Sequence, residues 1–149
     1  KLIWGDKKLV MSSLLKEYAG KINLIYIDPP FDVGADFSVK VKVGDEEVTK
    51  EPSILEEKAY RDTWGKGTNS YLQMMYERLF LIRELLAGNG SIYVHLDWHV
   101  GDYVRVIMDD VFGRDNFLGE IIWYYYNKLA SGTKKFSSAH DRILFYSGF

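Results

Sequence analysis

The segment of this sequence with the clearest chemical potential is Asp28-Pro29-Pro30-Phe31. It follows residues 22–27, a short apolar run rich in isoleucine and bounded by glycine and proline, which predicts a buried strand. In open α/β sheets, ligands bind beyond the carboxyl ends of the strands. Because proline has no backbone N–H, the segment offers a carboxylate, carbonyl oxygens and an aromatic face. These groups suit a planar ligand with an NH2 group, although Asp and Pro also favour ordinary turns.

The elements that must position this segment alternate between strand and helix. Residues 2–4 form a short strand candidate, and Asp6 can cap a helix over residues 7–18. The other expected elements are a small hairpin near residues 39–45, a helix at about 69–87 that Gly88 can end, a strand at 91–96, a helix between Asp97 and Gly113, and strands at 118–125 and 142–147. Residues 32–68 form a long connection. We expect it to be the least regular part of the chain and to close over the ligand site.

Two strands with no helix between them follow the alternation, so the sequence predicts an α/β fold with a mostly parallel sheet and an antiparallel C-terminal hairpin. The 149 residues suit one domain or part of one, and the apolar fraction of 47% is sufficient for a packed core. The sequence has no stretch long enough to span a membrane and no cysteine, which favours a cytoplasmic location and leaves no thiolate site. A net charge of −2 and a pI of about 5.9 argue mildly against a self-sufficient DNA-binding domain.

Asp28-Pro29-Pro30-Phe31 resembles the catalytic signature of the amino-group DNA methyltransferases, (Asp/Asn/Ser)-Pro-Pro-(Tyr/Phe/Trp). The surrounding sequence is similar to the permuted β-class of that family, which includes type III modification subunits and related adenine methylases. The matching segments cover nearly the whole chain and are residues 2–6, 60–64, 71–79, 90–99 and 140–144. The tetrapeptide alone is moderately specific, and these neighbours in this order make the resemblance strong.

The resemblance implies methyl transfer from S-adenosylmethionine to an exocyclic amino nitrogen of DNA. Adenine N6 is preferred because Asp rather than Ser stands at position 28. Asp28 and the Pro29 carbonyl would accept the two amino hydrogens and stabilise the positive charge that develops on nitrogen. Phe31 would stack on the base, which must be flipped out of the duplex. The alternatives are cytosine N4, RNA or a protein amide as methyl acceptor, and a non-catalytic DNA-binding or assembly module.

The cofactor signature of the family, Phe-x-Gly-x-Gly after a strand, does not occur in this sequence. In the β-class it lies C-terminal to the catalytic motif, beyond the target-recognition region. The resemblance therefore implies that residues 1–149 are the N-terminal part of a catalytic domain, with an incomplete Rossmann-like methyltransferase fold. Such a piece would be inactive alone and bind S-adenosylmethionine weakly at most. Its strand at residues 24–27 would keep an open edge or pair with another chain, so a homodimer or a restriction-subunit partner is expected.

Four acidic or histidine positions have competing interpretations. By resemblance, Asp6 lies near the adenine end of the cofactor, but capping alone explains an aspartate there. Asp97 is explained better as a helix cap than as a ligand contact. His95 and His99 straddle a strand end and a helix start, and methyl transfer to nitrogen needs no metal. We therefore expect no metal site.

Aromatic and basic residues meet near the C-terminal hairpin, where residues 123–126 are followed by Lys128, Lys134 and Lys135. A core strand would bury about half of the rings and leave the lysines on a solvated turn. A DNA-contacting loop would instead use the lysines for phosphates and the rings for bases. His140 belongs to a His-Asp pair that resembles a family element near the catalytic pocket. It is a fourth DNA-binding candidate, or simply the entry to the last strand.

Overall fold

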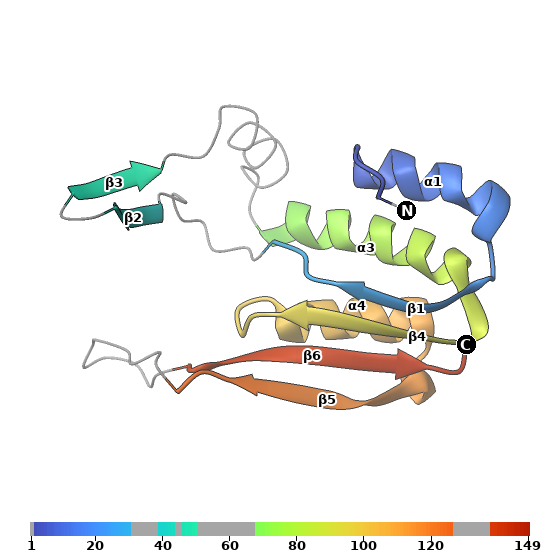
Figure 1. Ribbon diagram of the computed structural model, residues 1–149. Coiled ribbons are helices and arrows are strands. Elements are labelled where there is room, and N and C mark those ends of the chain that lie inside the picture. Colours follow the sequence, from blue (N-terminus) through green and yellow to red (C-terminus); the bar gives the residue numbers. More distant parts are fainter. Residues whose placement is uncertain (1, 31–38, 44–45, 51–67, 127–137) are drawn as a thin grey trace.

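The computed structural model describes residues 2–30, 39–43, 46–50, 68–126 and 138–149 (Figure 1). The elements in chain order are α1 (Lys7–Tyr18), β1 (Ile22–Ile27), β2 (Val39–Val43), β3 (Glu46–Lys50), α3 (Thr68–Leu85), β4 (Leu86–Leu96), α4 (Gly101–Phe112), a 3-10 turn (Arg114–Asn116), β5 (Phe117–Tyr124) and β6 (His140–Ser147). β2 and β3 pair antiparallel with Val43 opposite Glu46, which confirms the expected small hairpin. The rest of the 32–68 connection, apart from this hairpin and the start of α3, lies outside the described residues, as does its expected irregularity.

Four strands form one sheet in the order β1-β4-β6-β5. β1 runs parallel to β4, with Ile27 opposite Val94, while β6 runs antiparallel to both β4 and β5. The α/β class and the antiparallel C-terminal hairpin are confirmed. Parallel pairing is confined to β1 and β4, so the described sheet is mixed rather than mostly parallel. β1 has β4 as its only neighbour among the described strands, which agrees with the open edge expected at residues 24–27.

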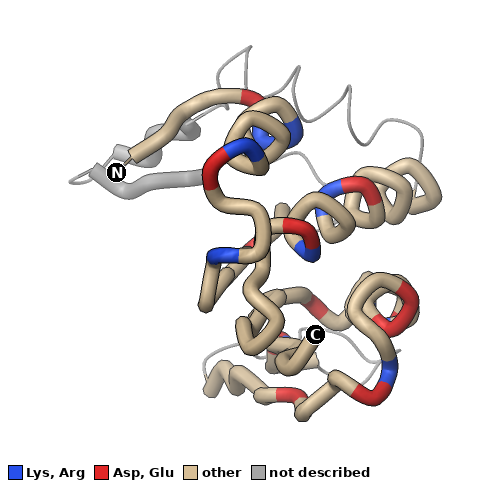
Figure 2. Tube along the Cα trace, turned by 90° about the vertical axis from the view of Figure 1, so that its right-hand side faces the viewer, with Lys and Arg blue, Asp and Glu red and all other residues tan. Residues whose placement is uncertain are grey.

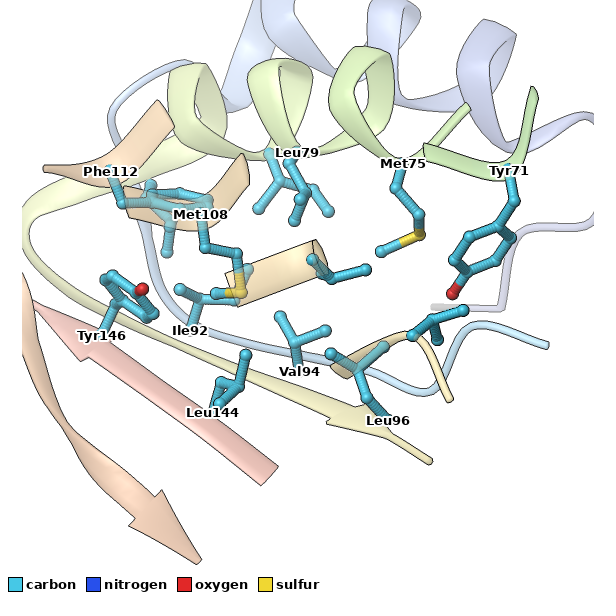
Figure 3. Packing of buried hydrophobic residues seen from close by; sticks show 14 residues of the cluster. Tyr71, Met75, Leu79, Ile92, Val94, Leu96, Met108, Phe112, Leu144 and Tyr146 are labelled. Atoms are coloured by element: carbon cyan, nitrogen blue, oxygen red, sulfur yellow. The ribbon is translucent and has the colours of Figure 1, made fainter. Parts of the chain in front are cut away.

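The hydrophobic core lies between one face of this sheet and the two helices α3 and α4 (Figure 3). Residues three or four apart on α3 face the sheet, and alternate residues of β4 and β6 face the helices. The core side chains include Tyr71, Met75, Leu79 and Ile82 of α3, Ile92, Val94 and Leu96 of β4, Val104, Met108 and Phe112 of α4, and Leu144 and Tyr146 of β6. Each fully buried leucine or valine contributes about 1.5–3 kcal/mol through removal of apolar surface from water. α1 packs against the outside of α3.

The opposite face of the sheet carries the residues that alternate with the core positions. Leu24 and Trp123 on this face are 61% and 54% exposed. Tyr93 and Phe145 come from neighbouring strands and stack with their ring centroids 4.5 Å apart. No described helix packs on this face, so it presents an aromatic and apolar surface with polar groups among it.

Local signals predicted α1 and β1 with the bounds that the structure has. The Asp6 carboxylate accepts a hydrogen bond from the Leu9 backbone N–H at 3.0 Å, as expected of a helix cap. Residues 2–4, in contrast, are not a strand: Leu2 and Trp4 are 97% and 98% exposed. The reason is that a strand needs a partner, and no described strand lies beside them.

Two predicted boundaries, the end of the helix at about 69–87 and the start of the strand at 91–96, differ from the structure because strand pairing outweighed the local signals. The helix α3 ends at Leu85 rather than near residue 87, because Leu86 already pairs with Ile22 of β1. Gly88 therefore lies in β4 and does not end the helix. Gly90 is required where the two strands approach, because a Cβ atom there would lie 2.9 Å from the Ile22 carbonyl oxygen.

The strand predicted at residues 118–125 is β5, shifted by one residue, but the core-strand alternative, which would bury about half of the rings at residues 123–126, is wrong. Trp123, Tyr124 and Tyr126 are 54%, 70% and 84% exposed, and only Tyr125 is partly buried. The reason is that β5 is the other edge of the described sheet and has β6 alone as its neighbour. Within the described ranges, no helix has the length and hydropathy that crossing a membrane requires.

Candidate active site

The carboxyl end of β1 leads directly into Asp28, Pro29 and Pro30, the described part of the tetrapeptide that the sequence analysis identified. Asp28 is exposed directly after the strand, the Pro29 side chain is buried, and Pro30 is exposed again. The buried ring of Pro29 anchors the backbone, and its fixed φ angle sets the direction of the adjacent carbonyl groups. Phe31 lies outside the described residues. The structure thus leaves the Asp28 carboxylate open to a ligand while holding its backbone in place.

Four side chains meet on the sheet face away from the helices. Tyr26, His95 and Asp141 come from three strands, and Tyr125 follows β5 directly. We call these four residues the Tyr26 network. The Tyr26 hydroxyl lies 2.9 Å from His95 Nδ1, and His95 Nε2 lies 3.3 Å from Asp141 Oδ2. The Tyr125 hydroxyl donates to the same Asp141 oxygen at 2.5 Å. Asp141 is 4% exposed, so its carboxylate sits in a largely dry environment bounded by these partners.

Strand register explains why these residues meet. Tyr93 and His95 are two residues apart on β4, so both point to one face of the sheet, and Asp28 follows Tyr26 by two residues just past the end of β1. Tyr26 is opposite Tyr93 in the parallel pair β1–β4. His95 is opposite Ile143 in the antiparallel pair, which brings Asp141 to the same face. The network therefore forms beside the carboxyl end of β1.

The surroundings raise the pKa values of both tyrosines, through different main causes. The hydrogen bond to Asp141 is the main cause that raises the pKa of Tyr125 to about 12, with burial and the charges of Asp141 and Asp28 adding to it. Burial, and then the charge of Asp28, raise the pKa of Tyr26. Asp28 is therefore close enough to act electrostatically on both hydroxyl groups. Both hydroxyls stay protonated at neutral pH and can serve as hydrogen-bond donors.

Asp97 follows β4 at the same edge of the sheet and acts as a local cap. Its Oδ1 accepts hydrogen bonds from the backbone N–H groups of His99 at 3.1 Å and Val100 at 3.3 Å, and its Oδ2 lies 2.7 Å from His99 Nδ1. Asp97 therefore caps the turn at residues 98–100 and not the helix: α4 begins at Gly101, and its N-cap residue Val100 has no side-chain cap, so the predicted helix cap is wrong. His95 and His99 each contact a different carboxylate. Within the described ranges no group of three metal-ligating side chains occurs.

The DNA-binding candidates are only partly placed. Lys128, Lys134 and Lys135 lie outside the described residues, and His140 begins β6 with a half-buried side chain. Along the described chain, basic and acidic positions are interspersed rather than gathered in one basic run (Figure 2). A groove of about 370 Å³ lies between α1 and α3; it is lined by residues such as Ser12 and Phe80 and does not include the Asp28 segment.

Sequence reasoning found Asp28 but missed Tyr26, and it singled out Asp141 only as the neighbour of His140. The period of two along β1 was the available signal, because it puts Tyr26 on the same face as Asp28. The partners of Tyr26 carried no such signal. His95 and Asp141 are 46 residues apart, and only the strand order brings them together.

The fold of this chain is similar to the folds of solved DNA methyltransferases. The structure of the M1.HpyAVI complex with S-adenosylmethionine superimposes with a TM-score of 0.54 at 12% identity, covering 98% of this chain and 53% of that chain. The PvuII DNA methyltransferase, described as cytosine-N4-specific, gives a TM-score of 0.56 at 19% identity, covering 97% of this chain and 48% of that chain. Likenesses at these identities define the fold.

Residues 22–148 match the family model described as DNA methylase, and the chain belongs to this family. It is 29% identical over 154 residues to the Mod subunit of the type III restriction-modification enzyme EcoP15I from Escherichia coli, covering 98% of this chain and 24% of that protein. It is 33% identical over 145 residues to the type II methyltransferase M.EcaI from Enterobacter cloacae, covering 97% of this chain and 28% of that protein. The chain thus spans about a quarter of the length of these relatives and about half of the solved structures.

Proposed function

We propose that residues 1–149 are the N-terminal part of the catalytic domain of a DNA methyltransferase that modifies adenine N6. The observation that carries this proposal is the exposed Asp28 carboxylate, followed by the buried Pro29, at the carboxyl end of β1 in a chain of the DNA methylase family. The similarity to a type III Mod subunit and to a type II methyltransferase supports DNA as the substrate. A DNA-modifying enzyme of this kind works beside the chromosome, in the cytoplasm of a prokaryotic cell.

The chemistry follows from the acceptors that the chain supplies. The lone pair of an aromatic amine is delocalised into the ring, so the amine is a weak nucleophile. Asp28 and the Pro29 carbonyl would accept the two N–H hydrogens and favour the tetrahedral, positively charged nitrogen of the transition state. Phe31 would hold the flipped base by stacking, and Pro30 would keep the backbone extended between them. Tyr26, two residues before Asp28, would add a hydroxyl group to the lining of this site.

S-adenosylmethionine, when bound, supplies an activated methyl group. Among the described residues the exposed carboxylate of Asp6 suits a cofactor hydroxyl, since one carboxylate can cap α1 through Oδ1 and accept a further hydrogen bond. Asp28 would border the methyl donor as well as the base. Asp6 and Asp28 would then each supply one carboxylate to the cofactor site.

The DNA contacts are proposed from the residue types of the candidates, because three of the four lie outside the described residues. Lys128, Lys134 and Lys135 would neutralise phosphates, and His140 would lie near the pocket entrance. A second copy of the chain or a restriction subunit would be a protein partner, since the related EcoP15I protein is a subunit of a larger enzyme. The open edge of β1 is a surface that strand pairing with such a partner could cover.

Product analysis tests the proposal. The full-length protein is incubated with DNA and S-adenosylmethionine carrying a labelled methyl group, and the DNA is digested to nucleosides that are identified by mass spectrometry. N6-methyladenine is the expected product. N4-methylcytosine would favour the second candidate, which the fold shared with a cytosine-N4-specific enzyme keeps open. No labelled nucleoside under conditions in which the protein binds both DNA and cofactor would indicate a non-catalytic module.

The aromatic residue of the tetrapeptide offers an independent check. Phe31→Tyr keeps the stacking face and should retain activity, whereas Phe31→Ala removes a contact worth about 1–3 kcal/mol and should weaken the use of the target base accordingly. The measurement is the rate of methyl transfer at saturating cofactor over a range of DNA concentrations. Equal rates for the two variants would show that Phe31 does not stack on the base.

A further inference from the structure

Hydrogen-bonding rules determine which atom donates each hydrogen in the Tyr26 network. An ionised carboxylate can only accept hydrogen bonds, so Asp141 Oδ2 must receive a hydrogen from His95 Nε2. The Nδ1 atom of a neutral His95 then carries a lone pair and accepts the hydrogen of the Tyr26 hydroxyl. Each hydrogen in this chain points away from Asp28 and toward the buried Asp141.

Tyr26 links this chain to the Asp28 site. Because its own hydrogen is directed to His95, the Tyr26 oxygen presents lone pairs to any other donor nearby. Asp28 follows the end of β1 two residues farther along, and after burial its charge is the second cause that raises the pKa of Tyr26. A proton that arrives on the Asp28 carboxylate therefore has an acceptor beside it, and the acceptor's own hydrogen already points to a base.

We propose that Tyr26, His95 and Asp141 form a relay that carries away the proton released when the target amine is methylated. This inference rests on the proposed function and assigns a role to side chains beside the methylation site. The reaction leaves a surplus proton that the enzyme must place. As the amine nitrogen bonds to the methyl carbon, the methyl–sulfur bond breaks with its electron pair staying on sulfur. The nitrogen is then positively charged and must lose one hydrogen.

The steps balance without a further reactant. The surplus proton passes from the methylated nitrogen to an oxygen of Asp28. Asp28 passes it to the Tyr26 oxygen while the hydroxyl hydrogen of Tyr26 moves to His95 Nδ1. The products are a neutral methylamine, an ionised Asp28, an intact Tyr26 hydroxyl and an imidazolium that the buried Asp141 carboxylate stabilises. The proton leaves His95 for solvent before the next turnover.

Tyr103 provides a control, because its side chain is 58% exposed on α4 and lies outside the Tyr26 network. Tyr103→Phe and Tyr26→Phe each remove one tyrosine hydroxyl group. Tyr26→Phe interrupts the relay, whereas Tyr103→Phe leaves it continuous. His95→Ala removes the final base and leaves space in which added imidazole can bind.

The experiment measures the steady-state rate of methyl transfer by the full-length protein over many turnovers, together with the dissociation constants for DNA and S-adenosylmethionine, because the relay acts after the methyl group has moved and must be reset before the next turnover. Since general acid–base groups contribute about 10²–10⁴-fold to rates, Tyr26→Phe and His95→Ala should slow the transfer by at least about tenfold with both dissociation constants unchanged. Tyr103→Phe should stay within about threefold of the wild type, and imidazole should restore the rate of His95→Ala but not that of Tyr26→Phe.

Three results would overturn the relay. These are a wild-type rate in Tyr26→Phe, an equal loss in Tyr26→Phe and Tyr103→Phe, and a failure of imidazole to restore His95→Ala when its thermal unfolding matches that of the wild type. The proposed function fails separately, through a wild-type protein that transfers no methyl group to DNA, and this outcome also overturns the relay.

Discussion

The two faces of the sheet have opposite characters. The face under α3 and α4 is packed with hydrocarbon, and Leu79, Val94 and Leu144 on it are fully buried. The opposite face holds the Tyr26 network beside exposed apolar residues such as Leu24. The alternation of each strand divides the residues between these faces. The first face gives the free energy that holds the strands in register, and the second uses that register to bring together groups from distant parts of the sequence.

The comparison predicts that equal substitutions on the two faces have unequal costs. Leu79→Ala removes a fully buried side chain and should lower the free energy of unfolding by about 2–5 kcal/mol. Leu24→Ala, on the face opposite the helices, should cost the 149-residue chain less than about 1 kcal/mol, because Leu24 is already 61% exposed. Urea denaturation followed by circular dichroism measures both values. Similar losses of unfolding free energy for the two variants would contradict the difference between the two faces of the sheet.

A smaller effect is expected where a single polar group organises a helix end. Asp6→Ala removes the acceptor of the Leu9 N–H and should cost about 1 kcal/mol, with a range of about 0.5–2 kcal/mol. Glu17→Ala, an exposed position at the other end of α1, is the control and should change stability by less than about 0.5 kcal/mol. An Asp6→Ala variant as stable as the control would show that the cap contributes nothing.

The smallest expected effect is an alkaline dependence that arises from the network. The folded chain holds the Tyr125 proton more tightly than an unfolded chain, in which the pKa of tyrosine is about 10. The stabilisation is therefore complete below pH 10 and is lost as the pH rises through the folded pKa of about 12. Solvent screening keeps the effect modest. Unfolding measured between these pH values should show a steeper loss for the wild type than for Tyr125→Phe, and parallel curves would contradict it.

The sequence predicted best what depends on neighbouring residues. The bounds of α1, its cap at Asp6 and the extent of β1 follow from spacing, capping and the glycine and proline signals around them. It failed where distant partners decide. Residues 2–4 lack a described partner strand, and Trp123 lies on an edge strand with a single neighbour. Likewise, nothing local indicates that Tyr26 meets His95, which is 69 residues away.

The central claim is that Asp28 acts on the target amine, and its removal tests this most directly. In the full-length protein, Asp28→Ala should leave the dissociation constant for S-adenosylmethionine nearly unchanged, while Glu17→Ala on the distant α1 serves as the control with normal activity. Because removing one preorganised polar group from a transition state costs about 10²–10³-fold in rate, Asp28→Ala should lose methyl transfer to DNA by at least this factor. Near wild-type turnover by Asp28→Ala would contradict the account.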